Sequence, residues 1–449
     1  MATLVSMRLA LLGGGGFRTP LVFRALVDRD DDLDVDQLVL YDVDAGRLAT
    51  ISSVLEGIAP NGSGPKVSTT TDLDTAVRGA DVVFAAIRVG GADGRIADER
   101  NALDLGVLGQ ETVGAGGLTY GLRSLPVMLH IAQRIAALAP NAWLLNFTNP
   151  AGMITQALSD PLPGKVIGIC DSPIGLVRRA CRAVGASPSM TDADYVGINH
   201  LGWLRSLRVD GADLLPALLA DPAALAGIEE GRLFGPELLR GLGSIPNEYL
   251  YFYYAHRDLV TALQDGSTRG EVVAADQRDF YAVPASDPQS ALRRWSDARL
   301  RRERSYLAEA RGAEPRDQSD LTGGGYQDVA VNLMSALTGG PDQRVIVNCR
   351  NGSAIGQLPP DMVVEVPCMA SAAGVSALPV PDPLTLHQLG LIATVRAAET
   401  TLIEAVRRGS RELARLAFVE HPLIGSPRIA DMLVSAAIHD NAELQQLLR

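Results

Sequence analysis

Residues 8–27 read RLALLGGGGFRTPLVFRALV, an apolar run, four glycines and a second apolar run that begins with a proline. We predict a strand over residues 8–12, a tight turn over residues 13–16 and a helix that starts at Pro20 with Thr19 as its N-cap. A strand, a glycine turn and a helix in this order are the context that a dinucleotide-binding turn requires. Glycines let backbone amides approach a pyrophosphate, and the helix N-terminus favours negative charge there.

The usual glycine fingerprint is incomplete, because Thr19 stands where the third glycine would be. A second predicted strand, residues 37–41, ends at Asp42. An acid at this place can bind ribose hydroxyls and repels a 2′-phosphate, which favours NAD over NADP. A structural turn that binds no nucleotide is the alternative. The turn, helix, strand and terminal acid together favour the nucleotide.

Further apolar runs predict strands at residues 81–87, 143–146 and 166–169, with helical patterns such as residues 127–138 between them. Strands that alternate with helices are typical of a parallel sheet covered on both faces. The sequence therefore predicts an α/β fold with a Rossmann-type, doubly wound parallel sheet, as in lactate and malate dehydrogenases.

After about residue 195 the pattern changes. Helices are predicted over residues 204–245, 270–314 (with a stop at Pro315) and 391–406, and strands over residues 344–347 and 362–366. We expect two domains, a NAD-binding Rossmann domain over residues 1–195 and an α+β catalytic domain over residues 196–449 that binds substrate and metal.

Composition excludes some classes of protein. The chain has 449 residues, more than one hydrophobic core usually holds, and a net charge of −12. That charge argues against binding to nucleic acid or to an anionic membrane. The four scattered cysteines indicate a reducing compartment. The first apolar run lacks a basic flank and is interrupted by glycines, so we expect a cytoplasmic protein without a signal peptide or membrane span.

Residues 165–173, KVIGICDSP, predict a buried strand that ends at Cys170 and Asp171. Ligands of open α/β sheets bind at the carboxyl ends of strands. Thirty residues later, GINHLGW offers His200. A thiolate and an imidazole form a partial metal shell that substrate oxygens can complete. The alternative is an ordinary buried cysteine, which is the commoner state of this residue.

Taken together, these motifs resemble glycoside hydrolase family 4, the NAD- and metal-dependent 6-phosphoglucosidases, over nearly the whole chain. The resemblance rests on ordered segments: GGGFRTP (14–20), YDVD (41–44), RVGG (88–91), GQETVG (109–114), NFTNPAG (146–152), GICDSP (168–173), GINHLGW (197–203), YLYFYY (249–254), GGGY (323–326), RNGSAI (350–355), LPPD (358–361), VEVPC (364–368) and HPL (421–423). This family departs from the two-carboxylate mechanism of most glycosidases.

The resemblance implies a reaction by oxidation at C3, deprotonation at C2, elimination at C1, addition of water and return of the hydride. It implies that Cys170 and His200 bind a divalent metal, with Mn²⁺ as the expected ion. It implies a tyrosine as the C2 base, with Tyr249 as first choice and Tyr253 as alternate. Asp171 would act as an acid on the leaving oxygen or support the metal.

The resemblance also implies two sets of binding residues. The residues expected to bind the cofactor are Gly13, Gly14, Gly15, Gly16, Phe17, Arg18, Asp42 and Arg47. Those expected to bind the substrate are Arg88, Arg95, Asn149, Glu111 and Arg269, where the arginines would hold the 6-phosphate and Glu111 could orient metal-bound groups. We expect a phosphorylated disaccharide or aryl glucoside as substrate and a homodimer or homotetramer.

The anomeric preference has two interpretations. Asp171 is typical of the phospho-α-glucosidases, whereas RNGSAI and GGGY look like segments of the phospho-β-glucosidases, and we favour the β-enzyme. Two other functions stay open: a 2-hydroxy-acid dehydrogenase without a metal, which would accumulate NADH, and a non-catalytic NAD-binding regulator. The Cys170–His200 pair and the tyrosine cluster argue against both.

Overall fold

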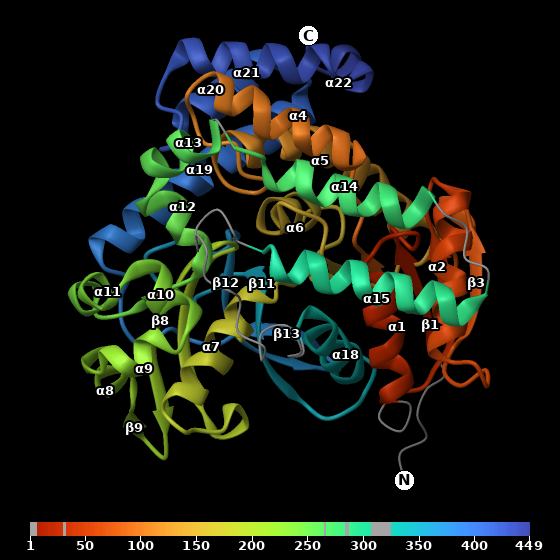
Figure 1. The fold of residues 1–449 in the computed structure, drawn as a ribbon, viewed down its shortest axis with the longest axis horizontal. Helices are drawn as coiled ribbons and strands as arrows, with labels where there is room; N and C mark the ends of the chain where they lie inside the picture. The colour runs from red at the N-terminus through yellow and green to blue at the C-terminus, as the bar shows by residue number, and fades with distance from the viewer. Residues whose placement is uncertain (1–6, 30–32, 265, 283–286, 307–324) are drawn as a thin grey trace.

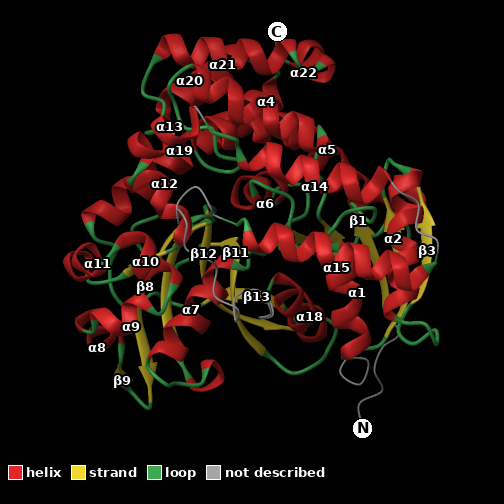
Figure 2. Ribbon diagram, in the orientation of Figure 1, coloured by secondary structure: helices red, strands yellow, loops and turns green. Residues whose placement is uncertain are grey.

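The computed structural model describes residues 7–29, 33–264, 266–282, 287–306 and 325–449. Within them, one sheet of thirteen strands runs through the middle of the molecule (Figure 2). Its first six strands are β1 (Met7–Leu12), β2 (Val35–Tyr41), β3 (Lys66–Thr70), β4 (Val82–Ala85), β5 (Trp143–Asn146) and β6 (Val166–Gly168). They are parallel and lie in the order 3-2-1-4-5-6, which confirms the predicted Rossmann sheet.

Both faces of this parallel sheet are buried, which explains why its strands read as continuous apolar runs. On β1, Leu9 and Leu11 belong to one hydrophobic core and Ala10 and Leu12 to another on the opposite face. The first core includes α1 (Thr19–Asp28) and α2 (Ala45–Ile58), and the second includes α5 (Gly114–Leu138) and α6 (Ala151–Leu158).

The same sheet continues beyond β6 with antiparallel strands in the order β11, β12, β7, β8 and β10. These strands are β7 (Asp192–Ile198), β8 (Leu201–Val209), β10 (Ile245–Pro246), β11 (Gln343–Arg350) and β12 (Val363–Ser371), with β9 (Ala212–Asp213) and β13 (Gly374–Ala377) at their edges. The junction is the pair Gly168–Asn348, where a Cβ on Gly168 would lie 2.8 Å from that of Asn348. The two-domain division after residue 195 stays a prediction, and it would fall inside β7.

Two local predictions are wrong. Residues 204–209, predicted as helix, belong to strand β8 (Leu201–Val209), because both faces of this strand are largely buried and a two-sided apolar run does not reveal its period. The N-cap of α1 is Arg18 rather than Thr19, and no side chain caps this helix. Pro315, the predicted helix stop, lies outside the described residues.

Helices α14 (Arg269–Ala282) and α15 (Pro288–Arg304) run across the Rossmann half (Figure 1). Helix α15 packs against α2, where a Cβ on Gly57 would lie 2.4 Å from the carbonyl oxygen of Pro288. Other helices of the described chain are α4 (Gly91–Asp104), α7 (Ser172–Ala183), α10 (Glu229–Phe234), α12 (Tyr251–Tyr254), α13 (His256–Gln264), α18 (Tyr326–Leu337), α19 (Leu386–Arg408), α20 (Arg411–Glu420), α21 (Pro427–His439) and α22 (Ala442–Leu447).

Helices α8 (Leu215–Ala220), α9 (Pro222–Ala226), α10 and α11 (Pro236–Leu242) confirm the helical prediction for the later part of residues 204–245. None of the helices in the described part of the chain is both long and apolar enough to cross a bilayer.

Candidate active site

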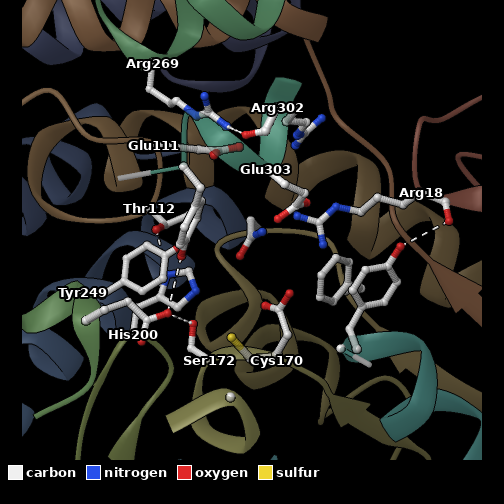
Figure 3. Close-up of a pocket in the computed structure, with 18 of the residues that line it drawn as sticks. Arg18, Glu111, Thr112, Cys170, Ser172, His200, Tyr249, Arg269, Arg302 and Glu303 are labelled. Atoms are coloured by element: carbon white, nitrogen blue, oxygen red, sulfur yellow. Dashed lines mark hydrogen bonds between the residues drawn. The ribbon is translucent and has the colours of Figure 1, made fainter. Parts of the chain in front are cut away.

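A cavity of about 230 Å³ lies where β5, β6 and the β7–β8 hairpin end, with residues of α15 on its other side (Figure 3). Ten of the residues predicted as site residues line it: Arg18, Arg88, Arg95, Glu111, Asn149, Cys170, Asp171, His200, Tyr249 and Arg269. The glycine turn, Phe17, Asp42, Arg47 and Tyr253 are not among its lining residues. The sheet therefore gathers side chains from distant parts of the sequence at one point.

His200 enters the cavity from the tight β7–β8 turn. Ile198 pairs with Leu201, so Asn199 and His200 alone form the turn, and His200 has a φ of +62°. Left-handed backbone is common at the central residues of two-residue hairpin turns. Burial lowers the pKa of His200 to about 4, so its imidazole is neutral at neutral pH, as a metal ligand must be.

A chain of hydrogen bonds fixes the tautomer of His200. The backbone amide of Thr112 donates to Gln110 Oε1 at 2.7 Å, so this amide oxygen is an acceptor. The Thr112 hydroxyl donates to the same oxygen at 3.1 Å, and it therefore accepts from His200 Nδ1, 2.7 Å away. The proton sits on Nδ1, and the lone pair of Nε2 is left to bind a metal.

Tyr249 lies flat against His200, with ring centroids 3.6 Å apart (Figure 3). It belongs to the short turn Glu248–Leu250, which Asn247 caps by accepting the Tyr249 amide at 2.9 Å. The Asn247 amide donates to the carbonyl of Gly202 on β8 at 2.8 Å. The sequence thus ties this tyrosine to the hairpin that carries His200. Burial raises the pKa of Tyr249 well above its ordinary value.

Cys170 follows β6 and is buried, and burial raises the pKa of its thiol well above the ordinary value. A bound cation would reverse this shift, since a coordinating thiol is deprotonated outright. Within the described ranges, no group of three or more His, Cys, Asp or Glu side chains gathers as a metal site. Cys170 and His200 therefore supply a partial shell.

Arg18 and Asp171 line the same cavity. The Arg18 guanidinium lies 4.3 Å from the ring centroid of Phe147 and 4.9 Å from that of Tyr326. Its Nη1 atom is buried and has no hydrogen-bond partner among the described residues. Asp171 is the N-cap residue of α7, and its Oδ2 lies 3.7 Å from the position of a Cβ on Gly325.

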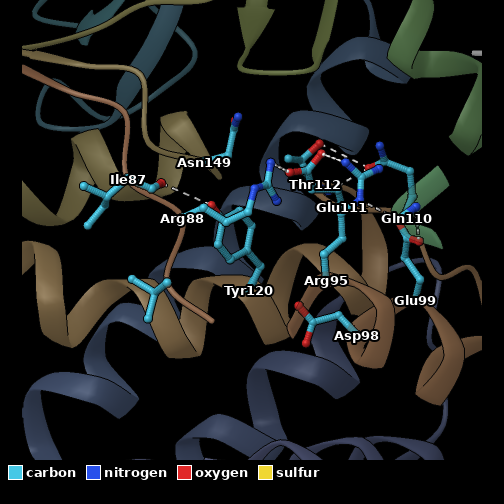
Figure 4. A network of polar contacts seen from close by, with 12 residues as sticks. Ile87, Arg88, Arg95, Asp98, Glu99, Gln110, Glu111, Thr112, Tyr120 and Asn149 are labelled. Carbon is cyan, nitrogen blue, oxygen red and sulfur yellow. Dashed lines mark hydrogen bonds and ion pairs between the residues drawn. The ribbon is translucent and has the colours of Figure 1, made fainter. Parts of the chain in front are cut away.

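Arg88 and Arg95 are already paired (Figure 4). Glu111 forms ion pairs with Arg88 and, at 2.7 Å, with Arg95, which also pairs with Glu99 at 2.7 Å. These arginines hold the pKa of Glu111 well below its usual range against the opposing effect of burial. The Arg95 side chain is only 8% exposed and its charge is already balanced by two carboxylates. We therefore expect it to hold Glu111 in position rather than to bind an anionic ligand. The Asn149 side chain accepts the amide of Ala151 at 3.3 Å.

Arg269 donates to Ser305 and to the carbonyl of Arg302, at 2.7 Å for the latter. Arg302 itself forms no ion pair with a carboxylate of the described chain, and it lines the cavity. Burial and then the charges of Arg18, Arg88 and Arg269 lower its pKa to about 9. This cluster of arginines is an environment that stabilises a bound anion.

The glycine turn lies between strand and helix as predicted. Gly13 has a φ of +86°, and a Cβ there would lie 2.5 Å from the carbonyl oxygen of Ala86. The Gly15 amide donates to Asp42 Oδ2 at 3.1 Å. Arg47 stacks on the ring of Tyr281 with 4.8 Å to the centroid. Asp42 and Arg47 therefore border the turn rather than the cavity.

Three aromatic side chains from later in the chain donate hydrogen bonds to backbone carbonyls of this turn and of the two residues that follow it. Tyr281 donates to the Gly15 carbonyl at 2.7 Å, Trp295 Nε1 to that of Phe17 at 3.0 Å, and Tyr326 to that of Arg18 at 3.1 Å. Sequence reasoning missed Tyr281 and Trp295, since nothing near them indicates a contact across more than 260 positions. Tyr326 is the last residue of the GGGY segment, whose first two glycines lie outside the described residues.

Tyr253, the alternate base, is placed elsewhere. It is half-buried, and its ring centroid lies 6.3 Å from that of His421. Sequence reasoning also passed over Arg302, Tyr306 and Glu248, which line the cavity. Of these three residues, only Glu248 could have been found from the sequence, because it directly precedes Tyr249, the proposed base.

Two family models together match most of the chain. Residues 8–186 match the family described as "Family 4 glycosyl hydrolase", and residues 195–424 match its C-terminal domain. The chain belongs to this family.

A relative from Bacillus subtilis (strain 168), described as a probable 6-phospho-beta-glucosidase, is 30% identical over 441 residues, 95% of each chain. The 6-phospho-beta glucosidase of Thermotoga maritima, solved with manganese, NAD⁺ and glucose-6-phosphate, has a TM-score of 0.82 at 26% identity and covers 98% of this chain and 99% of its own. A 6-phospho-alpha-glucosidase from gut microorganisms, solved with NAD and Mn²⁺, has a TM-score of 0.81 at the same identity and coverage. The proteins similar to this chain thus include both 6-phospho-beta- and 6-phospho-alpha-glucosidases.

The likeness to lactate dehydrogenase is one of fold alone. The enzyme of Eimeria maxima is 14% identical, with a TM-score of 0.52, and covers 91% of this chain. It confirms the predicted dehydrogenase-like fold, and it carries no argument about the substrate.

Proposed function

We propose that the protein hydrolyses 6-phospho-β-glucosides with NAD and a divalent metal, Mn²⁺ first among them. One observation carries the proposal: Cys170, His200 and Tyr249 face a single cavity at the carboxyl ends of the Rossmann strands. A plain 2-hydroxy-acid dehydrogenase has no use for a thiol–imidazole pair stacked against a tyrosine.

The residues present fit both groups. For the metal, the Nε2 lone pair of His200 and the Cys170 thiol are the donors, and this mixed N/S set suits borderline divalent ions. For NAD, Gly13–Gly16 and the N-terminus of α1 form the pyrophosphate cradle, and Asp42 faces the turn where ribose hydroxyls would bind. When bound, NAD takes and returns a hydride at C3 of the sugar, and the metal acidifies the proton at C2.

We assign removal of the C2 proton to Tyr249. Its ring is held by the stack on His200 and by the Asn247 cap, so its hydroxyl has a fixed position beside the metal-binding side chains. Asp171 lines the cavity next to Cys170 in the sequence, and we assign protonation of the leaving oxygen to it. Glu111, held by Arg88 and Arg95, and Asn149 orient the sugar hydroxyls.

The 6-phosphate is assigned to the arginines of the cavity. Arg302 has no carboxylate partner among the described residues and a lowered pKa, and Arg269 lies beside it. We infer that Arg302 supplies the charge that the sequence prediction had assigned to Arg88 and Arg95. A phosphate dianion would relieve the mutual repulsion of these guanidinium groups.

The β-preference rests on the 30% identical relative and on the GGGY segment, whose Gly325 and Tyr326 line the cavity. The RNGSAI segment gives no support to the β-preference. The side-chain amide of Asn351 donates to the carbonyls of Ile355, Leu358 and Pro359, which do not line the cavity. A 6-phospho-α-glucosidase is the second candidate, favoured by Asp171 next to Cys170.

A substrate panel tests these assignments. Purified protein with NAD and Mn²⁺ is given 4-nitrophenyl α- and β-glucosides, each with and without the 6-phosphate. We expect turnover of the phosphorylated β-glucoside, loss of turnover with EDTA and no net NADH. Turnover without NAD contradicts the mechanism, and exclusive turnover of the α-anomer selects the second candidate. We further propose that the protein is cytoplasmic and forms a homodimer or homotetramer, and native mass spectrometry would test the oligomeric state. We also propose that residues 1–195 form the NAD-binding part, and limited proteolysis would test this boundary.

A further inference from the structure

A row of five paired residues crosses the sheet between Cys170 and His200. In the strand order β6, β11, β12, β7 and β8, it consists of Gly168, Asn348, Glu365, Gly197 and Gly202. Cys170 follows the first residue of this row by two positions, and His200 precedes the last by two. The two proposed metal ligands therefore flank the row, and strands β11 and β12 separate them.

Backbone pairing is sparse at two junctions of this row. In the described part of the chain, β6 pairs with β11 only through Gly168 and Asn348, and β12 pairs with β7 only through Glu365 and Gly197. By contrast, β11 pairs with β12 along its whole length, Gln343–Arg350. A single pair gives little control of the angle and spacing between two strands, so side chains have to supply it.

Glu365 lies at the centre of the row and is fully buried. Its Oε1 accepts Asn348 Nδ2 at 2.7 Å and Asn199 Nδ2 at 3.2 Å, and its Oε2 accepts the Tyr195 hydroxyl at 3.2 Å. The three donors come from β11, from the turn that carries His200 and from β7. Because all three point at one carboxylate, Glu365 ties these elements together where the backbone does not.

A second path leads from Glu365 to Tyr249. The Tyr195 hydroxyl accepts Asn247 Nδ2 at 3.3 Å, and Asn247 Oδ1 accepts the backbone amide of Tyr249 at 2.9 Å. Tyr195 and Asn247 are fully buried, so bulk water does not compete for these bonds. The carboxylate that holds the His200 turn thus also orients the turn of Tyr249.

Two glycines of the row leave room for this network. A Cβ on Gly202 would lie 2.3 Å from the Tyr195 hydroxyl oxygen, and one on Gly168 would lie 2.8 Å from the Cβ of Asn348. Since interiors are close-packed, a side chain at either position would displace a member of the network. These glycines belong to the GICDSP and GINHLGW segments, which therefore encode space for the network besides the two proposed metal ligands.

We propose that Glu365 is a positioning residue, which holds the turns of His200 and Tyr249 in a fixed place relative to Cys170. The inference rests on the proposed function, in which these three side chains bind the metal and remove the C2 proton. Neither Glu365 nor any of its three donors is among the residues that line the cavity. Glu365 therefore acts through the residues that it holds and does not touch the sugar.

Tyr195→Phe tests the path to Tyr249. Phenylalanine keeps the ring and removes only the hydroxyl, so the Asn247 cap loses the partner that orients it, while the hydrogen bonds to His200 and its turn remain. We expect kcat with NAD, saturating Mn²⁺ and a phosphorylated glucoside to fall about 10- to 100-fold. KM, and the Mn²⁺ affinity without substrate by electron paramagnetic resonance titration, should stay within about 2-fold.

Asn199→Ser tests the path to His200. Serine suits a turn, but its side chain is too short to reach Glu365, so the turn loses its tie to β12. We expect the Mn²⁺ affinity without substrate to weaken about 10-fold, as for loss of an outer-shell contact. The matched control for both variants is Tyr254→Phe. The Tyr254 hydroxyl bonds Trp203 Nε1 on the same hairpin at 3.3 Å but is outside the network, so this variant should keep the parent kcat and Mn²⁺ affinity.

Glu365→Gln tests the carboxylate itself. Glutamine keeps the volume and one acceptor oxygen, which the two asparagines occupy, and its NH₂ group then faces Tyr195. The Tyr195 hydroxyl is left without an acceptor. We expect the same loss of kcat as for Tyr195→Phe, and the double variant should lose nothing more, because both changes interrupt one path. Thermal melting identifies misfolded protein, and if Glu365→Gln does not fold, Tyr195→Phe and Asn199→Ser decide.

The outcomes separate this inference from the proposed function. If the parent protein turns over no phosphorylated glucoside or binds no Mn²⁺, the proposed function itself is wrong. If the parent does both, but Tyr195→Phe keeps the parent kcat or Asn199→Ser keeps the parent Mn²⁺ affinity, the inference alone is wrong. It is also wrong if Tyr195→Phe lowers kcat and Mn²⁺ affinity in the same proportion, since a general loss of structure would do so.

Discussion

The imidazole of His200 and the phenol ring of Tyr249 are parallel, with an interplanar angle of 2° and centroids 3.6 Å apart. One ring comes from the β7–β8 turn and the other from the capped turn Glu248–Leu250, which is tied to β8 through Asn247. The proposed metal ligand and the proposed base therefore cannot move independently. A base beside a metal-binding side chain is what abstraction of a proton next to a polarised carbonyl requires.

The first prediction concerns Tyr249→Phe. Phenylalanine keeps the ring that packs on His200 and removes only the hydroxyl. We expect kcat to fall by about 10²- to 10⁴-fold, as for loss of a general base, while the affinity for Mn²⁺ stays within about 2-fold. Steady-state kinetics and C2 deuterium exchange measure the loss. Tyr253→Phe, in a ring outside the cavity, is the control and should retain near-parent kcat.

The second prediction concerns Thr112, which accepts the Nδ1 proton of His200 at 2.7 Å. Thr112→Val keeps the shape and removes the acceptor, so the imidazole loses the bond that sets its tautomer. We expect Mn²⁺ affinity without substrate to weaken about 10- to 100-fold, measured by electron paramagnetic resonance titration of free Mn²⁺. Thr112→Ser, which keeps the hydroxyl, should bind like the parent. Parent-like binding by Thr112→Val would contradict the tautomer assignment.

The third prediction separates Arg302 from its neighbours. Arg302→Gln removes a cavity guanidinium that forms no ion pair with a carboxylate among the described residues. A charge-assisted hydrogen bond contributes about 1.5–3 kcal/mol, so KM for a phosphorylated glucoside should rise about 10- to 100-fold. KM for the unphosphorylated glucoside should change little. Arg301→Gln, at a 53% exposed side chain that pairs with Asp276, is the control. Equal effects on both substrates would exclude a phosphate contact.

The sequence predicted those features of the site that a short stretch of neighbouring residues determines. The glycine turn and Cys170 at a strand end were predicted because each is set by a few neighbouring residues. The sequence also pointed to His200, but not to the tight turn that carries it. Strand order alone does not bring Cys170 and His200 together, because β11 and β12 lie between β6 and β7 in the sheet.

The residues that the sequence did not reveal depend on packing across the chain. Arg302 and Tyr306 reach the cavity only because α15 crosses the Rossmann half, held by Trp295 against Phe17 and by Pro288 against Gly57. Arg88 and Arg95 looked like phosphate ligands by position, whereas Glu111 pairs with both. A sequence shows the charge of a side chain but not which partner neutralises it.

The fourth prediction concerns the hydrogen bond from Tyr281 to the glycine turn. Tyr281→Phe removes the hydroxyl that donates to the Gly15 carbonyl at 2.7 Å and leaves the ring under Arg47. A net hydrogen bond contributes about 0.5–1.5 kcal/mol, so the Kd for NAD should rise about 2- to 10-fold by calorimetry. Tyr254→Phe, whose hydroxyl bonds Trp203 Nε1 at 3.3 Å, is the control and should bind NAD like the parent.

The fifth prediction concerns acid stability and His421. This side chain is buried, and its Nδ1 accepts the amide of Leu423 at 3.2 Å, so only the neutral form fits. Burial lowers its pKa to about 3, from an ordinary 6.5. Between these values the unfolded chain binds a proton that the folded chain does not, so the stability contributed by neutral His421 is fully present above pH 6.5 and is lost as pH falls.

The variant His421→Gln removes this titration and keeps an acceptor for the Leu423 amide. We therefore expect the stability of the parent relative to this variant to fall by about 2–3 kcal/mol between pH 7 and 4.5. Urea unfolding at several pH values measures the difference. His439→Gln, at an exposed position on α21, should show the same pH dependence as the parent. A pH-independent difference between the parent and His421→Gln would show that His421 does not titrate on unfolding, because linkage requires the difference to change wherever the two states bind different numbers of protons.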